Sequence, residues 1–309
     1  MTPDVHPHVS VVIPTYNRKA LLLEAIASVQ QQTFRDLEIL VCDDGSTDGS
    51  GEAVQRLAGA DTRIRWIQGE HSGLPGTNRN RGIRAARGEW IAFQDSDDLW
   101  LPDKLQKQFE VLRSAPEAGF VYSYAVALQG DGTKKRMTPF NIQREGRMFE
   151  TLLLYSIVLT STVLVRRDLL ERAGPFDESL RLTIGEDYEL FLRLAAQVPF
   201  HFVAEDLVVY RMQADSVSAD LLDGIDQVER VLRVTIERQQ VPADLAGRAL
   251  AKLDLRRYKQ HLLRGAAKDV RERHLRAALD KEPGSVLGNA LLLTEKLGGA
   301  ALVRLLARR

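Results

Sequence analysis

The sequence Trp-Ile-Ala-Phe-Gln-Asp-Ser-Asp-Asp-Leu-Trp, residues 90–100, passes from an apolar, aromatic-rich segment into clustered carboxylates and back into apolar residues. The apolar part is typical of a buried strand, and the polar part of a short loop at its end. The carboxylates of Asp95, Asp97 and Asp98 repel one another unless a cation or hydrogen-bond donors hold them. A hard divalent cation is one such partner, since Mg²⁺, Mn²⁺ and Ca²⁺ take oxygen ligands. The alternative is an acidic loop that caps the helix predicted to follow it.

Apolar segments alternate with segments of helical periodicity through the N-terminal third of the chain. The predicted strands are residues 9–13, 37–41, 64–67 and 90–94. Such alternation is typical of βαβ units and of a parallel sheet that helices cover on both faces, which explains the near-continuous apolar strands. The sequence therefore predicts an α/β fold.

Polar residues follow three of these strands. They occupy residues 15–18, 43–46 and 95–98. Ligands of open α/β sheets bind beyond the carboxyl ends of the strands, so we expect these segments to line one crevice.

Familiar nucleotide and metal motifs are missing from the sequence. No strand runs into G-x-G-x-x-G, and there is neither a G-x-x-x-x-G-K-[ST] loop nor an H-E-x-x-H motif. Residues 44–55 partly imitate a calcium loop, but Ser46 stands at position 3, where the motif has Asp or Asn, and Gln55 stands where a bidentate Glu is needed. A dinucleotide-binding fold, a P-loop enzyme and a calcium-binding loop of this type are disfavoured.

Composition and charge restrict the class of protein. The 309 residues carry no net charge, so there is no electrostatic footprint for nucleic acid. Cys42 is the single cysteine, which excludes an internal disulfide and favours the cytosol. The sequence has neither a signal-peptide pattern nor a run of about 18 apolar residues, so we expect neither secretion nor a membrane span.

The charges are distributed unevenly between two parts of the chain. From Leu221 onward there are 18 Lys and Arg against 11 Asp and Glu, and residues 1–220 carry 24 against 31. The pattern beyond residue 220 is helical throughout. We expect a first domain over residues 1–220 and a helical region over 221–309. Residues 286–306 predict either a packed helical hairpin or a basic amphipathic segment that rests on an anionic membrane surface.

Further strands are predicted at residues 120–128 and 160–165, with a strand pair at 201–203 and 207–210. Residues 133–147 predict a polar loop. Thr77 is expected to cap the helix that precedes residue 90. Glu186 and Asp187 precede a helix at 188–196, where two acidic residues complement the helix dipole.

Several of these motifs together resemble a known family. Val-Ser-Val-Val-Ile-Pro-Thr-Tyr-Asn-Arg (residues 9–18), Asp-Asp-Gly-Ser-Thr-Asp (43–48), Arg-Asn-x-Gly (79–82), Asp-Ser-Asp-Asp (95–98) and Glu-Asp (186–187) stand in the order and spacing of the family 2 inverting glycosyltransferases. The resemblance covers roughly residues 9–215. It implies the GT-A fold, which is a nucleotide-binding, Rossmann-like sheet with helices on both faces, followed here by a C-terminal α-helical region.

The resemblance implies a set of contacts to a nucleotide-sugar donor. These positions are Pro14, Thr15, Tyr16, Arg18, Asp44, Arg79, Asp95 and Ser96. Within the set, Tyr16 is similar to the residue that stacks on the base, and Asp44 to the carboxylate that accepts a hydrogen bond from it. Asp95 is similar to the residue beside the ribose.

The resemblance also implies a divalent metal ion, Mn²⁺ or Mg²⁺, and a general base. Asp97, together with Asp98, is similar to the metal ligand, and Asp187 is similar to the base. Many family members carry a His after the Tyr-Arg pair of the last strand, but Gln213 stands in that region here. The Gln-x-x-Arg-Trp signature of polymerising members is absent, so we expect transfer of a single sugar.

The expected function is metal-dependent, inverting transfer of one sugar from a nucleoside diphosphate sugar, with UDP-sugars favoured, to an acceptor hydroxyl in the biosynthesis of a surface polysaccharide or another glycoconjugate. The acceptor is a glycan, a lipid-linked molecule or a small molecule. Peripheral contact with the inner face of the membrane and a homodimer are left open.

Two other functions remain as alternatives. A non-catalytic nucleotide- or calcium-binding module would need no carboxylate at Asp187. A nucleotidyltransferase should carry a Gly-rich, basic loop after its first strand, whereas this chain has Pro14-Thr15-Tyr16-Asn17 there.

Overall fold

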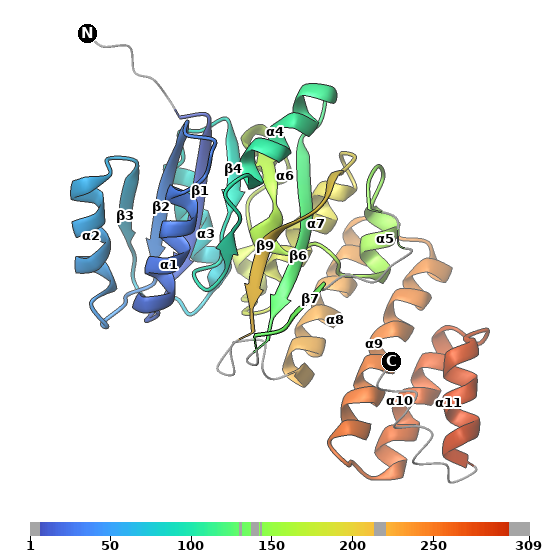
Figure 1. Ribbon diagram of the computed structural model, residues 1–309. Coiled ribbons are helices and arrows are strands. Elements are labelled where there is room, and N and C mark those ends of the chain that lie inside the picture. Colours follow the sequence, from blue (N-terminus) through green and yellow to red (C-terminus); the bar gives the residue numbers. More distant parts are fainter. Residues whose placement is uncertain (1–6, 130–131, 137–141, 143, 213–220, 297–309) are drawn as a thin grey trace. The chain divides into compact units, whose positions relative to one another are not determined.

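A computed structural model describes residues 7–129, 132–136, 142, 144–212 and 221–296 of the chain. Two compact units can be distinguished (Figure 1). The first comprises Met1–Leu152 and Ser156–Ser216, and the second comprises Leu153–Tyr155 and Val217–Arg309.

Nine strands of the described chain form one sheet in the first unit. They are β1 (Val9–Thr15), β2 (Leu37–Asp43), β3 (Ile64–Gln68), β4 (Trp90–Phe93), β5 (Leu99–Trp100), β6 (Phe120–Leu128), β7 (Lys134–Arg136), β8 (Leu164–Arg166) and β9 (His201–Arg211). Their order is β3-β2-β1-β4-β8-β6-β9-β5, with β7 paired to β6. The first four in this order are parallel, as predicted, but β8 runs antiparallel to both β4 and β6. The complete sheet is therefore mixed.

Helices of the first unit cover both faces of the sheet (Figure 1). They are α1 (Lys19–Gln30), α2 (Ser50–Ala60), α3 (Pro75–Ala85), α4 (Lys104–Ser114), α6 (Arg167–Ala173) and α7 (Glu186–Ala195), with short 3-10 helices η1 (Thr160–Thr162) and η2 (Glu178–Leu180). Helix α5 (Phe149–Leu154) begins among residues of the first unit and ends among residues of the second. Together with the sheet, the helices of the first unit make the α/β fold that the sequence predicts.

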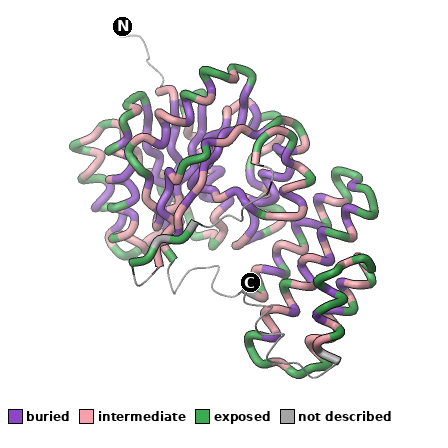
Figure 2. Tube along the Cα trace, turned by 45° about the vertical axis from the view of Figure 1, so that its right-hand side comes forward, coloured by how far each residue is buried: buried purple, intermediate pink, exposed green. Residues whose placement is uncertain are grey.

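The central strands are apolar along their whole length because helices pack on both of their faces. Val11 of β1 belongs to the same apolar cluster as Leu22 and Ile26 of α1. Side chains alternate along a strand, so Val12 points to the other face, where Gly82 of α3 lies against it. Figure 2 shows this sheet as a buried interior.

Three local predictions differ from the structure. The strand predicted at residues 160–165 is the 3-10 turn η1 followed by β8, because the amides of Thr162 and Val163 bond to carbonyls three residues back. The predicted strand pair at 201–210 is the single strand β9, which pairs with β6 through a register shift. Helix α3 begins at Pro75, before Thr77, since proline is well suited to the first helical position.

The second unit is helical where it is described, as the sequence predicts. Its helices are α8 (Leu221–Arg238), α9 (Ala243–Leu263), α10 (Lys268–Lys281) and α11 (Val286–Lys296). Tyr258, Leu262, Leu275 and Leu291 form a small core. Within the described ranges, no helix is long and apolar enough to cross a membrane. Gln213, residues 137–141 and 143 of the expected polar loop and the chain after residue 296 lie outside the described residues.

The close approach of α3 to the sheet yields a stability prediction. A Cβ atom at Gly82 would lie 2.4 Å from Cγ1 of Val12 and 2.9 Å from Sγ of Cys42. Gly82→Ala should therefore lower the free energy of unfolding by about 1–3 kcal/mol, the usual cost of overpacking a core. Urea unfolding measures it. The matched control is Gly59→Ala in α2, where the added Cβ meets nothing within 4 Å; equal unfolding midpoints for the two variants would contradict the prediction.

Candidate functional site

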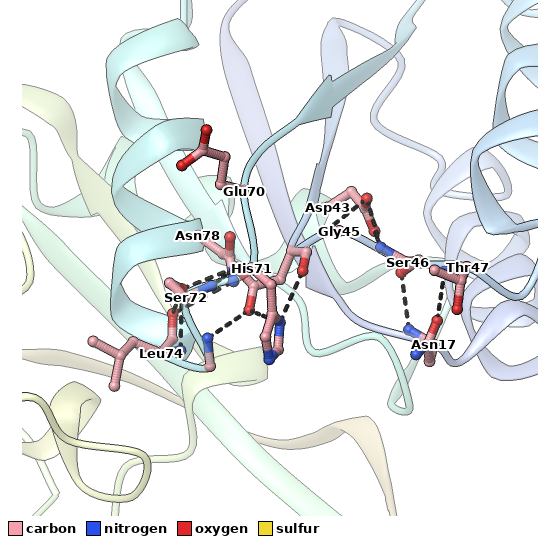
Figure 3. Close-up of polar contacts among 12 residues, drawn as sticks. Asn17, Asp43, Gly45, Ser46, Thr47, Glu70, His71, Ser72, Leu74 and Asn78 are labelled. Carbon is pink, nitrogen blue, oxygen red and sulfur yellow. Dashed lines mark hydrogen bonds and ion pairs between the residues drawn. The ribbon is translucent and has the colours of Figure 1, made fainter.

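The loops after β1, β2 and β4 meet at one edge of the sheet, as the sequence predicts. The amide of Asn17 donates to Oγ of Ser46 at 2.9 Å, and the amide of Thr47 donates to Oδ1 of Asn17 at 2.7 Å (Figure 3). Arg18 forms an ion pair with Asp97. The first loop is therefore bonded to both of the others.

Asp43 closes the turn after β2. Its side chain is fully buried and accepts hydrogen bonds from the amides of Gly45 and Ser46, both at 3.0 Å. Gly45 has a φ of 84°, a conformation that glycine adopts without strain. Asp43 thus has a structural role that leaves the neighbouring Asp44 to contact a different segment.

Asp44 holds the loop between β3 and α3. Its carboxylate accepts from the amide and hydroxyl of Ser72, each at 2.9 Å, and from the amide of Gly73 at 2.8 Å. His71 Nδ1 lies 3.1 Å from Oδ2 of the same carboxylate. Burial raises the pKa of Asp44, but the hydrogen bonds from Ser72 and Gly73 outweigh burial and lower the pKa below its ordinary value. The carboxylate is therefore anionic at neutral pH.

Tyr16 presents an aromatic ring beside Asp44. The residue is 43% exposed, and its ring stacks on that of His71 with centroids 4.3 Å apart. An exposed aromatic ring that a second ring supports is suited to stacking on a planar group such as a base. The structure thus brings Tyr16 and Asp44 together through His71, which the sequence did not single out.

The clustered carboxylates after β4 have different surroundings. Asp98 is 2% exposed and accepts hydrogen bonds from the hydroxyl of Ser161 in η1 and from the amide of Arg211 in β9. Burial, with the nearby charge of Asp95, raises the pKa of Asp98 well above its usual range. Asp98 therefore ties the loop to the rest of the sheet.

Asp95 and Asp97 are more accessible, with side chains that are 30% and 19% exposed. Asp95 pairs with Arg79 at 2.6 Å, and its amide donates to Oγ of Ser161 at 3.0 Å. Burial and the charge of Asp95 raise the pKa of Asp97, and the guanidinium of Arg18 opposes this rise. Ser96, which stands between these two residues in the sequence, is buried.

The carboxylate oxygen atoms of Asp95 and Asp97 suit a hard divalent cation that is also bound by the phosphates of a ligand. In the described part of the chain, no three or more His, Cys, Asp or Glu side chains are grouped to hold a metal ion. Mg²⁺ is usually bound by one or two carboxylates together with substrate phosphates. Asp97 and Asp95 fit that pattern, whereas both oxygen atoms of Asp98 are engaged within the protein.

Asp187 lies in the first turn of α7. It accepts hydrogen bonds from the hydroxyl of Thr160 and, at 2.7 Å, from the amide of Tyr188. The preceding Glu186 is buried and forms an ion pair with Arg79. Burial raises the pKa of Glu186 to about 7, although the guanidinium of Arg79 opposes the rise.

The 3-10 turn η1 connects the two parts of the site. Thr160 donates to Asp187, while the adjacent Ser161 donates to Asp98 and accepts from the amide of Asp95. These two hydroxyls were not expected at the site, because the segment was predicted to be a strand. The available signal in the sequence was the run of three hydroxyl residues, Thr160-Ser161-Thr162. All three are buried in the structure, where polar groups need hydrogen-bond partners.

Comparison with known sequences gives one family and several relatives. A sequence model of the family described as "Glycosyl transferase family 2" matches residues 10–174. An uncharacterized glycosyltransferase of Rickettsia bellii is 29% identical over 211 residues, which are 68% of this chain and 29% of the relative. The putative teichuronic acid biosynthesis glycosyltransferase TuaG of Bacillus subtilis is 29% identical over 215 residues, 69% of this chain and 82% of TuaG. The chain thus spans less than a third of the length of the first of these relatives.

A third relative has a named reaction. The UDP-Glc:alpha-D-GlcNAc-diphosphoundecaprenol beta-1,3-glucosyltransferase WfaP of Escherichia coli is 29% identical over 228 residues, 73% of this chain and 85% of WfaP.

Solved structures share the fold. S. aureus TarS 1–349 in complex with UDP-GlcNAc has a TM-score of 0.67 at 18% identity, over 97% of this chain and 90% of TarS 1–349. The mannosyltransferase PcManGT from Pyrobaculum calidifontis, in complex with GDP-Man and Mn²⁺, has a TM-score of 0.65 at 21% identity, over 99% and 85% of the two chains. With a GT-A fold, the expected motifs and a family match over more than half of its length, the chain belongs to glycosyl transferase family 2.

Proposed function

We propose that this protein transfers one sugar from a nucleoside diphosphate sugar to an acceptor hydroxyl, with inversion at the sugar carbon. The observation that carries the proposal is that η1 connects Asp187 with the loop after β4. Thr160 bonds to Asp187, and the next residue bonds to the loop that carries Asp95 and Asp97. A candidate base and an acidic, phosphate-side cluster are thus held by adjacent residues.

The donor is proposed to bind along the loops after β1 and β2. Tyr16 would stack on the base, with Pro14, Thr15 and Arg18 along the nucleotide, and Asp44 would shape the base pocket through the loop that it holds. Ser96 and Asp95 would lie beside the ribose. A UDP-sugar is favoured, because TarS was solved with UDP-GlcNAc and WfaP is named for UDP-Glc.

Asp97, assisted by Asp95, is proposed to hold Mn²⁺ or Mg²⁺ together with the donor phosphates. The cation would supply positive charge that stabilises the nucleoside diphosphate as it leaves. The PcManGT complex with GDP-Man and Mn²⁺ supports a metal ion in a protein of this fold. Asp98, also expected as a ligand, would act by fixing the loop.

Asp187 is proposed as the general base that takes the proton of the acceptor hydroxyl as the hydroxyl attacks the sugar. The hydroxyl of Thr160 and the first turn of α7 orient its carboxylate. One base without an enzyme nucleophile gives a single displacement. Glycoside hydrolases differ, since they use two carboxylates across the scissile bond.

The acceptor is proposed to belong to polysaccharide or glycoconjugate biosynthesis, because TuaG and WfaP are named for such pathways and WfaP acts on a diphosphoundecaprenol acceptor. A lipid-linked acceptor would place the enzyme at the cytoplasmic face of a membrane. Val286, Leu287 and Leu293 of α11 are 84%, 53% and 59% exposed, which suits contact with lipid.

The first prediction concerns the metal ion. Binding of UDP, measured by calorimetry, should be stronger with Mn²⁺ or Mg²⁺ than without. Asp97→Ala should abolish this metal-dependent gain in affinity together with most of the transfer activity, since it removes the main ligand. The control is Asp61→Ala, which deletes a carboxylate with a similar 17% exposure that pairs with Arg63 outside the site. Equal affinity of the wild type with and without EDTA would count against the metal.

The second prediction concerns the base. Asp187→Asn keeps the shape of the side chain but removes the proton acceptor, so transfer should fall by about 10²–10⁴-fold while the affinity for UDP persists. Turnover and calorimetry on the same preparation measure both quantities. Near-wild-type turnover would remove Asp187 from the mechanism and would favour a non-catalytic binding module or another base.

The third prediction concerns the membrane. The wild type should sediment with anionic vesicles at low salt and be released at high salt, because screening weakens attraction between exposed charges. Leu287→Glu with Leu293→Glu should abolish sedimentation. Leu263→Glu, at a position that is 51% exposed but outside α11, is the control. Failure of the wild type to bind such vesicles would refute membrane contact and leave the transferase proposal intact.

A further inference from the structure

A buried ion-pair bridge links α3, the loop after β4 and the start of α7. Arg79 donates from Nη2 to Oδ1 of Asp95 at 2.6 Å and from Nη1 to Oε1 of Glu186. The side chains of Arg79 and Glu186 are only 6% and 9% exposed. Nε of Arg79 has no hydrogen-bond partner among the described residues, and the guanidinium lies over the ring of Phe176.

This arrangement suits Arg79 to an internal role rather than to a nucleotide contact. Each of its terminal nitrogen atoms already holds a carboxylate. An arginine that recognises phosphate usually offers two parallel N–H groups to it. Arg79 could offer two such groups to a phosphate only by breaking its bond to Glu186. Breaking a buried ion pair is costly, because it leaves an uncompensated charge.

The bridge acts on the first turn of α7, where Glu186 directly precedes Asp187. Helix α3 is close to this turn: a Cβ atom at Gly76 would lie 3.4 Å from Cγ of Glu186. Arg79 therefore connects two packed helices by a charge-assisted bond. Through Asp95 the same guanidinium fixes the loop that carries the acidic cluster.

We propose that Arg79 and Glu186 are positioning residues, which fix the carboxylate of Asp187 relative to that of Asp95. The inference rests on the proposed function, because it takes Asp187 as the base. Neither positioning side chain touches the reacting atoms. Glu186 contacts only the Asp187 side of the site, so its loss should affect the rate of transfer and not donor affinity, since a misplacement of about 1 Å can cost about 10²-fold in rate.

The test starts with two substitutions. Glu186→Gln keeps the shape and removes the charge that Arg79 binds. Arg79→Lys keeps a charge but cannot span two carboxylates as a guanidinium fork does. With the acceptor and UDP-sugar that the wild type uses, each should lower kcat by about 10- to 10²-fold. In Glu186→Gln, the KM for the donor and the calorimetric affinity for UDP should stay unchanged.

Glu189→Gln is the matched control. Glu189 lies on the same helix, its side chain is 2% exposed, and it pairs with Arg193 at 2.8 Å. It thus reproduces the loss of a buried, arginine-paired carboxylate from α7 without touching the bridge. Its kcat should equal that of the wild type, and thermal unfolding of all variants shows whether a loss of rate merely follows a loss of stability.

A double-variant cycle identifies the route of the effect. If Glu186 acts through Asp187, then adding Glu186→Gln to Asp187→Asn should cause no further loss of kcat, whereas independent effects would multiply. Independent effects that multiply, an unchanged kcat in Glu186→Gln, or a raised donor KM in Glu186→Gln would each overturn the positioning role. Near-wild-type turnover of Asp187→Asn alone is a separate result, which overturns the base assignment of the proposed function and the positioning role with it.

Discussion

Clustered carboxylates at the end of a buried strand are the main constraint on this protein, because like charges in a poorly hydrated place repel one another. The fold compensates each carboxylate with a different donor from a different segment. The partners are Arg79 for Asp95, Arg18 for Asp97 and Ser161 for Asp98. Helix α3, the loop after β1 and the turn η1 are therefore all held around the end of β4.

The burial of each ion pair decides how easily that pair can be broken. A deeply buried ion pair is costly to break, since removal of one partner leaves an unpaired charge, whereas an accessible pair contributes little and exchanges readily. Arg79 and Glu186 are of the first kind, and Arg18 with Asp97 approaches the second. A buried frame thus surrounds Asp97, whose pair with Arg18 is the more accessible of the two.

Helix α3 explains why the Arg-Asn-x-Gly motif has its spacing. Arg79 spans Asp95 and Glu186, and Asn80 bonds to both the carbonyl and the amide of Phe176. Gly82, one helical turn after Arg79, permits close contact with the sheet. One short helix therefore packs on the strands, anchors the segment before α7 and joins both sides of the site.

The sequence by itself determined the α/β class, the four parallel strands, the helical C-terminal region and the convergence of the loops, because the apolar period and the order of elements in βαβ units are local properties. Family resemblance added Asp187 and Asp97 as candidates. Only the tertiary structure showed that Thr160, Ser161 and His71 join the site and that Arg79 pairs with Glu186, since these contacts lie between residues far apart in the chain. The mixed half of the sheet and the single strand β9 were likewise decided by pairing with distant strands, which no local period encodes.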